Sequence, residues 1–257
     1  MNEEKVVKFS KQGNIGIVAL EEKEHRNTFT HRFIYGLKDT FETIGRDPEV
    51  KVVVLHGYDN YFCCGGTKEE LIQLYESAGK EEGKGKVAFT DLNFHDLLLR
   101  CEVPVIAAMQ GHALGAGLAF GCYADIIVMG EQCIFSAIFM KYGFTPGFGA
   151  TYILPKKLGE ALGIEMLMSA RNYYGAELKE RGTPVKIVNK QDVIKTAMEI
   201  AGELADKPLL SLKVLKKHLT RQIQADLPDI IARELEMHRL TFGQKEVLER
   251  IEKLFGN

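Results

Sequence analysis

The chain has 257 residues, of which 46% are hydrophobic and 26% are charged, and its formal charge is −2 at pH 7. These values are ordinary for a globular protein and allow one large domain with a substantial core. The near-neutral balance gives no indication of a nucleic-acid or membrane partner. The first residues lack a secretory signal pattern and no apolar run approaches the roughly 20 residues of a membrane span, so we expect a cytoplasmic protein.

Five cysteines and seven histidines are present, and neither set has the spacing of a metal site. The histidines include no H-E-x-x-H pattern, and no C-x-x-C pair occurs among the cysteines. We therefore expect no metal ion, no disulfide framework and a reducing compartment. The cysteines are Cys63, Cys64, Cys101, Cys122 and Cys133.

The first part of the chain alternates short strand patterns with helical ones. "KVVKF" and "NIGIVAL" predict a hairpin of strands, and residues 30–45 predict an amphipathic helix. Three continuously apolar runs, "VKVVVLHG", "VPVIAAMQG" and "ADIIVMG", are typical of buried strands. This alternation favours an α/β architecture. The apolar face of the predicted helix consists of Phe33, Ile34, Leu37, Phe41 and Ile44.

Residues 75–90 and the C-terminal part differ from this pattern. The first is polar and punctuated by glycine, which predicts a loop or a frayed helix. From about residue 156 the patterns are almost purely helical, including "QDVIKTAMEIAGELAD", "PLLSLKVLKKHLTRQI" and "LPDIIARELEMHRLTFG".

Two glycine-rich turns, "YFCCGGT" and "HALGAGLAFG", each follow an apolar strand and precede a predicted helix. Small residues there let a ligand approach backbone N–H groups, and the helix dipole favours negative charge. Two such N–H groups directed at one oxygen would form an oxyanion hole, which stabilises a transition state by a few kcal/mol per donor. Neither the turns nor their spacing is specific by itself.

Four segments in the same order resemble the motifs of the crotonase (enoyl-CoA hydratase/isomerase) superfamily: "HRNTF", "NYFCCGGT", "VPVIAAMQGHALGAGLAFGCYADIIV" and "YGFTPGFGATYILPKKLG". The resemblance covers nearly the whole chain. It implies an α/β crotonase fold, a spiral of ββα units in residues 1–200, and a helical trimerisation or lid region in residues 201–257. It also implies an enzyme that holds a thioester carbonyl with two peptide N–H groups.

By motif position, those two donors are the amides of Cys64 and Ala116, with Gly65 and Gly115 beside them in the substrate pocket. Family members usually have glycine where this chain has Ala116 and a small residue at the position of Cys64. Because the donor is the backbone, both changes keep the N–H group. Cys64 as a nucleophile is an alternative, and we favour the simpler interpretation of a small side chain beside the turn.

The two glutamates that hydratases of this family use are absent. Their positions in the pocket are occupied by Ala119 and Phe139, which cannot transfer a proton. Hydration is therefore disfavoured. Decarboxylation fits better, because the oxyanion hole can stabilise a dienolate and an apolar pocket favours release of charge as neutral CO₂.

Within the superfamily, "GYDNYF", "MQGHALG", "FMKYGFTPGFGAT", "PKKLG" and "MHRLTF" resemble the PksI-like decarboxylases of polyketide β-branching cassettes. This implies conversion of 3-methylglutaconyl-acyl carrier protein to the 3-methylcrotonyl form, with a loop lysine and a helical histidine as catalytic groups. The histidine corresponds to His238. For the lysine we expect Lys86, with Lys84 as second choice over Lys80, and Tyr75 is a weaker candidate for orienting the carboxylate.

The resemblance implies no cofactor of the enzyme itself, because the substrate is carried on the phosphopantetheine of an acyl carrier protein, which is the expected partner. It also implies a homotrimer or dimer of trimers. Lys213, Lys217 and Arg221 are spaced i, i+4, i+8, with Lys216 adjacent. They form either a solvated helix face or a docking patch for an acidic carrier. Two alternatives to the decarboxylase stay open at this point: another crotonase-family isomerase or dehydratase, and a non-catalytic scaffold that binds acyl carriers.

Overall fold

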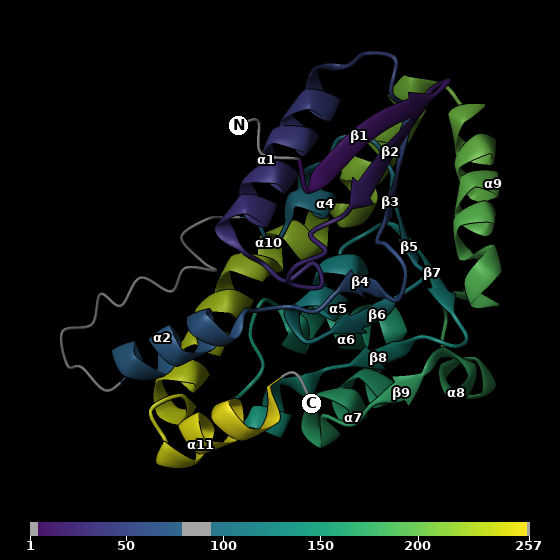
Figure 1. Ribbon diagram of the computed structural model, residues 1–257. Helices are drawn as coiled ribbons and strands as arrows, with labels where there is room; N and C mark the ends of the chain where they lie inside the picture. Colours follow the sequence, from purple (N-terminus) through teal and green to yellow (C-terminus); the bar gives the residue numbers. More distant parts are fainter. Residues whose placement is uncertain (1–4, 79–93, 256–257) are drawn as a thin grey trace.

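The computed structural model describes residues 5–78 and 94–255 and contains a six-stranded sheet with helix α9 (Val193–Ala205) outside it (Figure 1). Strands β1 and β2 pair antiparallel, as the predicted hairpin requires, and the other neighbours are parallel. The strand order is β1 (Val7–Gln12), β2 (Ile15–Leu20), β3 (Val52–His56), β5 (Val105–Met109), β7 (Ile126–Gly130) and β10 (Lys186–Val188).

A smaller sheet contains the strands that follow β3, β5 and β7 in the chain. In chain order β3 is followed by β4, β5 by β6 and β7 by β8, so each turn adds one strand to each sheet. This confirms the predicted spiral of ββα units and the α/β class. The smaller sheet has the order β4 (Tyr61–Cys63), β6 (His112–Leu114), β8 (Ile134–Ser136) and β9 (Tyr173–Tyr174).

Helix α1 (His31–Arg46) shows why the local sequence predicts its own structure. The hydroxyl of Thr30 accepts a hydrogen bond from the amide of Phe33 at 3.2 Å and caps the first turn. All five residues of the predicted apolar face are buried. The other helices of the core are α2 (Lys68–Ala78), α4 (Leu97–Arg100), α5 (Ala116–Cys122), η1 (Ile138–Tyr142), α6 (Ala150–Leu158), α7 (Glu160–Ser169), α8 (Gly175–Glu180) and η2 (Lys190–Asp192).

Helix α9 (Val193–Ala205) spans the predicted domain boundary. The division at 200/201 falls inside this helix, and Ala201 packs with Val193 and Ala197 in a small core against the larger sheet. Helical periodicity does not show which surface a helix covers, so the sequence could not place α9 with the spiral core. The change to the C-terminal helices comes at residues 206–208.

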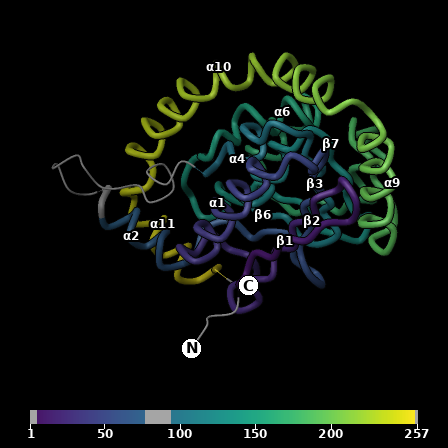
Figure 2. The backbone as a smooth tube through the Cα atoms, turned by 90° about the horizontal axis from the view of Figure 1, so that it is seen from above, coloured from purple at the N-terminus to yellow at the C-terminus, as the bar shows by residue number. Residues whose placement is uncertain are grey.

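Helix α10 (Leu209–Thr241) is one continuous helix of 33 residues that curves around the outside of the spiral core (Figure 2). It joins two helical patterns that the sequence showed separately and contains Pro228, whose missing N–H costs one helical hydrogen bond. Helix α11 (Lys245–Leu254) follows and lies against α2 and η1. No helix in residues 5–78 and 94–255 has both the length and the apolarity needed to cross a membrane.

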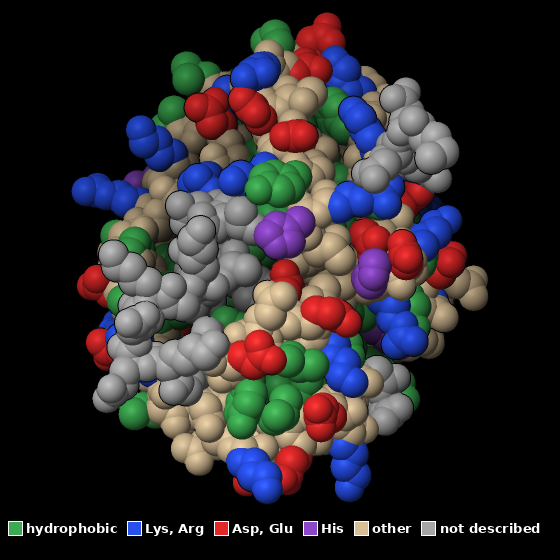
Figure 3. Space-filling view, turned by 60° about the vertical axis from the view of Figure 1, so that its left-hand side comes forward, with side chains coloured by type: hydrophobic (Ala, Val, Ile, Leu, Met, Phe, Trp, Pro, Cys, Tyr) green, Lys and Arg blue, Asp and Glu red, His purple; other side chains and the backbone are tan. Residues whose placement is uncertain are grey.

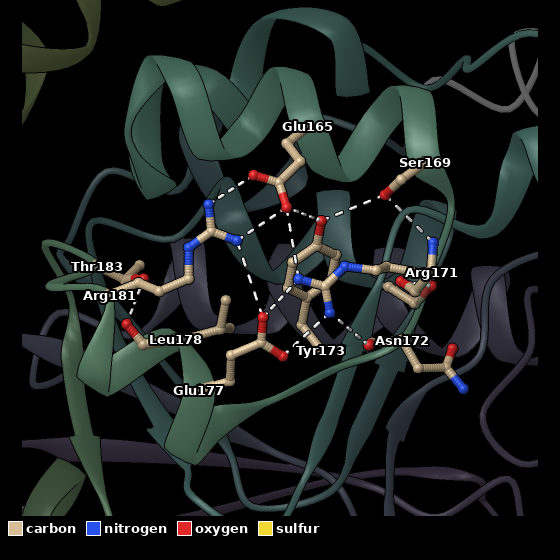
Figure 4. A network of polar contacts seen from close by, with 10 residues as sticks. Glu165, Ser169, Arg171, Asn172, Tyr173, Glu177, Leu178, Arg181 and Thr183 are labelled. Carbon is tan, nitrogen blue, oxygen red and sulfur yellow. Dashed lines mark hydrogen bonds and ion pairs between the residues drawn. The ribbon is translucent and has the colours of Figure 1, made fainter.

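A network of charged side chains joins α7 to α8 near the smaller sheet (Figure 4). Glu165 accepts hydrogen bonds from Arg181 at 2.6 Å and 2.9 Å and from the Tyr173 hydroxyl at 2.9 Å. These bonds lower the pKa of Glu165 to about 2. The guanidinium of Arg171 lies 3.6 Å from the centre of the Tyr173 ring. The network therefore orders the segment that carries β9.

Lys216 attaches α10 to the spiral core and does not belong to an exposed basic patch. Lys216 is only 5% exposed. The ammonium lies 2.8 Å from a carboxylate oxygen of Asp125 and donates to the carbonyls of Leu98 at 2.8 Å and Val103 at 3.0 Å. A buried charge with three such acceptors is fully satisfied.

Replacing Lys216 by Met should lower the free energy of unfolding by about 3–5 kcal/mol, because the change leaves the Asp125 carboxylate without its cation. Urea denaturation of the full chain measures the effect. The matched variant Lys217→Met alters an exposed neighbour and should change stability by less than about 0.5 kcal/mol. Equal stability of the two variants would show that the buried pair does not hold α10 in place.

Candidate functional site

The two glycine turns meet at the end of β4. A Cβ atom on Gly117 would lie 2.2 Å from the carbonyl oxygen of Cys63, and one on Gly65 would lie 2.9 Å from that of Leu114. Gly65 also has a φ of +79°, which few other residues adopt. The first turn of α5 can pack this closely against the β4 turn only because both residues lack side chains.

This packing brings the two predicted donor amides to one wall. A Cβ atom on Gly65 would lie 3.3 Å from the amide nitrogen of Ala116, and Cys64 immediately precedes Gly65. Ala116 is the first residue of α5, where amides have no partner within the helix and the dipole is positive. Within the described part of the chain, no acceptor takes the amide hydrogen of either Cys64 or Ala116. Both residues therefore offer N–H groups to a ligand.

A cavity of about 680 Å³ opens beside these turns, large enough for an acyl thioester and part of its carrier arm. Its wall combines the two turns with the 138–148 segment and the C-terminal half of α10. Of the predicted site residues, it contains Cys64, Gly65, Gly115, Ala116, Phe139 and His238.

Two predicted pocket residues are not among those that line the cavity in the described part of the chain. Ala119 is fully buried in the main core, about one helical turn after Ala116, and does not line the cavity. Tyr75 lies on α2, outside the lining residues. Motif alignment fixes a position along the chain but not the direction of its side chain. Phe139 does line the cavity and packs edge-to-face with Phe144 at 6.2 Å.

His238 extends from α10 into the cavity wall between two aromatic rings. Its Nε2 lies 2.8 Å from the carbonyl oxygen of Thr145. A carbonyl only accepts, so Nε2 carries a hydrogen and the neutral ring keeps its lone pair on Nδ1. Burial lowers the pKa of His238, against the opposing effect of this hydrogen bond. Burial thus favours the neutral form of the ring. Its aromatic neighbours are Phe144 and Phe242.

The thiol of Cys64 is a poor nucleophile in this environment. Burial raises the pKa of Cys64 to about 12, although the positive charge of Arg26 acts in the opposite direction. A thiol with so high a pKa has almost no thiolate at neutral pH. The alternative of covalent catalysis by Cys64 is therefore disfavoured on electrostatic grounds.

Of the remaining predicted residues, Lys213, Lys217 and Arg221 do not line the described cavity. Lys80, Lys84 and Lys86 lie outside the described residues. Lys213 pairs with Glu102 at 2.7 Å, while Lys217 and Arg221 are exposed. Arg221 is about 15 Å along the axis of α10 from Ile231, a residue of the cavity wall, at 1.5 Å per residue.

Most of the other cavity residues were not predicted from the sequence, and they include Arg26, His95 and Glu234. Burial lowers the pKa of His95, which packs edge-to-face with Phe148 at 6.0 Å. Glu234 is four residues before His238, so helical spacing could have identified it as a neighbour on the same face. Arg26 lies in the "HRNTF" motif, but nothing in the sequence around it indicated a role in the site.

The fold and the two converging turns together define a crotonase-fold enzyme with a thioester-sized cavity. Residues 10–254 match the family model of enoyl-CoA hydratase/isomerase, and the chain belongs to that family. It is 45% identical to the bacillaene synthase decarboxylase PksI of Bacillus subtilis (strain 168), over 93% of each chain. A probable mitochondrial enoyl-CoA hydratase of Dictyostelium discoideum is 25% identical over 93% of this chain and 84% of its own.

Solved structures similar to this chain indicate the same family. A protein of a dehydratase/decarboxylase enzyme couple involved in polyketide β-branching is 44% identical with a TM-score of 0.92, covering 98% of this chain and 100% of that one. The ECH2 decarboxylase domain of CurF from Lyngbya majuscula is 39% identical with a TM-score of 0.90, again over 98% and 100%. The chain is thus a decarboxylase of the crotonase superfamily, as its motifs indicated.

Cys64 should be alkylated slowly by iodoacetamide at pH 8, because its raised pKa leaves almost no thiolate. Peptide mass spectrometry on the native protein gives the rate, with free cysteine, whose pKa is about 8.5, as the reference. The labelling rate of Cys64 should keep rising by about tenfold per pH unit above pH 8.5, where that of free cysteine levels off. A rate equal to that of free cysteine at pH 8 would contradict the buried, protonated thiol described above.

Proposed function

We propose that this enzyme decarboxylates 3-methylglutaconyl-acyl carrier protein to 3-methylcrotonyl-acyl carrier protein during polyketide β-branching. One observation carries the proposal: two amides that have no acceptor among the described residues line a cavity in which Phe139 occupies a position where a hydratase would need a carboxylate. The similarity to PksI and to the β-branching decarboxylase structures supports the same reaction.

The reaction places its charge where these amides lie. Cleavage of the bond to the carboxyl carbon releases CO₂ and leaves the electron pair in a dienolate that extends to the thioester oxygen. The N–H groups of Cys64 and Ala116 donate to that oxygen and stabilise it most strongly when its charge is greatest. Addition of one proton at the γ carbon then restores a neutral α,β-enoyl thioester.

His238 supplies a proton in step with the loss of charge. A substrate carboxylate near the ring raises the histidine pKa, so Nδ1 takes up a proton while Nε2–H stays on the Thr145 carbonyl. When CO₂ departs, this favourable partner is lost and the pKa falls again. The proton on Nδ1 is then transferred to the dienolate carbon.

The loop lysine, Lys86 with Lys84 as second choice, completes the proposed machinery. A cation that held the carboxylate equally tightly throughout would stabilise the ground state and contribute little to the rate. We therefore assign it loose positioning of the carboxylate and assistance in proton delivery.

An acidic acyl carrier protein is the proposed partner, with phosphopantetheine as the only prosthetic group. Lys213, Lys217 and Arg221 remain a proposed docking patch, although the ion pair to Glu102 already engages Lys213. On the face shown in Figure 3, acidic and basic side chains are interspersed and do not form a field of one sign. A homotrimer or dimer of trimers and a cytoplasmic location complete the proposal.

An isomerase or dehydratase would require a free carboxylate base in the cavity. Glu234 lines the wall, but both of its oxygens already accept hydrogen bonds from the protein at 2.6–2.9 Å. It is thus poorly placed to remove a substrate proton.

Incubation with 3-methylglutaconyl-acyl carrier protein should reduce the mass of the loaded carrier by that of one CO₂, measured by intact-protein mass spectrometry. In a parallel incubation, 3-methylcrotonyl-acyl carrier protein should gain no water. A mass gain of one water in either incubation would indicate a hydratase, and an unchanged mass of the glutaconyl carrier would contradict decarboxylation.

A further inference from the structure

The carboxylate of Glu234 is a buried charged group in the cavity wall that has no part in the steps described above. The residue is 2% exposed. Its Oε2 accepts a hydrogen bond from the amide of Gly149 at 2.6 Å, and its Oε1 accepts from the amide and the hydroxyl of Thr151 at 2.9 Å and 2.6 Å. Burial raises the pKa of Glu234, and these bonds oppose the rise. Its partners are amides and a hydroxyl.

These donors all belong to the start of α6. Gly149 is the N-cap residue of that helix and has no side chain to serve as a cap, and the first turn contains no acidic residue. Glu234 therefore supplies from α10 the acceptor that the N-terminal amides need, and the helix dipole favours its negative charge there.

The same face of α10 holds the other end of this turn. His238 donates from Nε2 to the carbonyl of Thr145, and the hydroxyl of Thr241 accepts from the Thr145 amide at 3.3 Å. Glu234, His238 and Thr241 follow the spacing i, i+4, i+7, which places them on one side of a helix. Residues 145–151 are thus held at both ends by α10.

The segment between these attachments is conformationally strained. Phe148 has a φ of +66°, which residues other than glycine rarely adopt, and such a conformation persists only when its surroundings enforce it. Its ring lines the cavity and stacks on Phe29 with the centroids 5.3 Å apart. Loss of either attachment would let the turn relax and move the Thr145 carbonyl.

We propose that Glu234 is a positioning residue for His238. By fixing the 145–151 turn, its carboxylate keeps the Thr145 carbonyl against Nε2, and this contact leaves Nδ1 as the ring nitrogen available to the substrate. The catalytic consequence rests on the decarboxylation proposed above, whereas the effect on the histidine tautomer does not.

The variant Glu234→Gln tests this role. Both carboxylate oxygens of Glu234 accept hydrogen bonds, whereas a carboxamide replaces one of these acceptors by an NH₂ group, which can only donate. In the full chain with ¹⁵N-labelled histidine, wild-type His238 should show a protonated Nε2 and an unprotonated Nδ1 by NMR. The variant should show a mixture of tautomers. With the carrier substrate, its kcat should fall about 10- to 100-fold with little change in KM, as expected for a small misplacement.

Asp226→Asn is the matched control, because Asp226 also joins α10 to α6, through the hydroxyl of Tyr152 at 2.7 Å, but lies outside the cavity wall. It should keep the wild-type tautomer and kcat. If Glu234→Gln does not fold, Thr151→Ala removes one of the three donors and should give a smaller shift of the same kind. A wild-type tautomer in the folded Glu234 or Thr151 variant would overturn the positioning role. Absence of CO₂ release by the wild-type chain would contradict the reaction alone.

Discussion

The close contact between the β4 turn and the start of α5 is the constraint on which the site depends. Gly117 lies against the Cys63 carbonyl and Gly65 against the Leu114 carbonyl, at distances that no side chain would permit. This contact places the amides of Cys64 and Ala116 on one wall. The alternation of strands between two sheets creates the contact, because β4 and β6 are neighbours in the smaller sheet. The ββα spiral thus determines where the Cys64 and Ala116 amides lie.

Helix α10 is attached to the spiral core and supplies His238, the residue proposed to carry the proton. Near its start the buried ammonium of Lys216 binds Asp125 in the spiral core, and near its end Glu234 and His238 hold the 145–151 turn. A negative charge at Glu234 is tolerated because α6 provides amide donors for it. The cavity wall can therefore hold the Glu234 carboxylate without that group acting as a free base, because both of its oxygens accept hydrogen bonds from the start of α6.

Local patterns in the sequence predicted α1, the hairpin of β1 and β2, and the buried strands β3, β5 and β7, because apolar runs depend on nearby residues. They missed the short strands of the smaller sheet, and β10 lies where the patterns predicted an almost purely helical region. They did not predict that α9 packs on the sheet or that Ala119 lies in the core, since both depend on distant partners. Lys216 and Glu234 were missed as buried groups because a charged residue within a helix is usually solvated. The loop lysines lie outside the described residues, so their role rests on the motif resemblance alone.

The measurement that tests the central claim most directly is the decarboxylation rate of Ala116→Pro. Proline is tolerated at the first position of a helix, so the change removes the donor N–H while α5 can still form. The matched variant Ala116→Gly keeps the N–H. With both variants folded by circular dichroism, kcat of the proline variant should fall about 100- to 1,000-fold, and that of the glycine variant should stay near the wild-type value. A proline variant that decarboxylates at the wild-type rate would contradict stabilisation of the dienolate by the Ala116 amide.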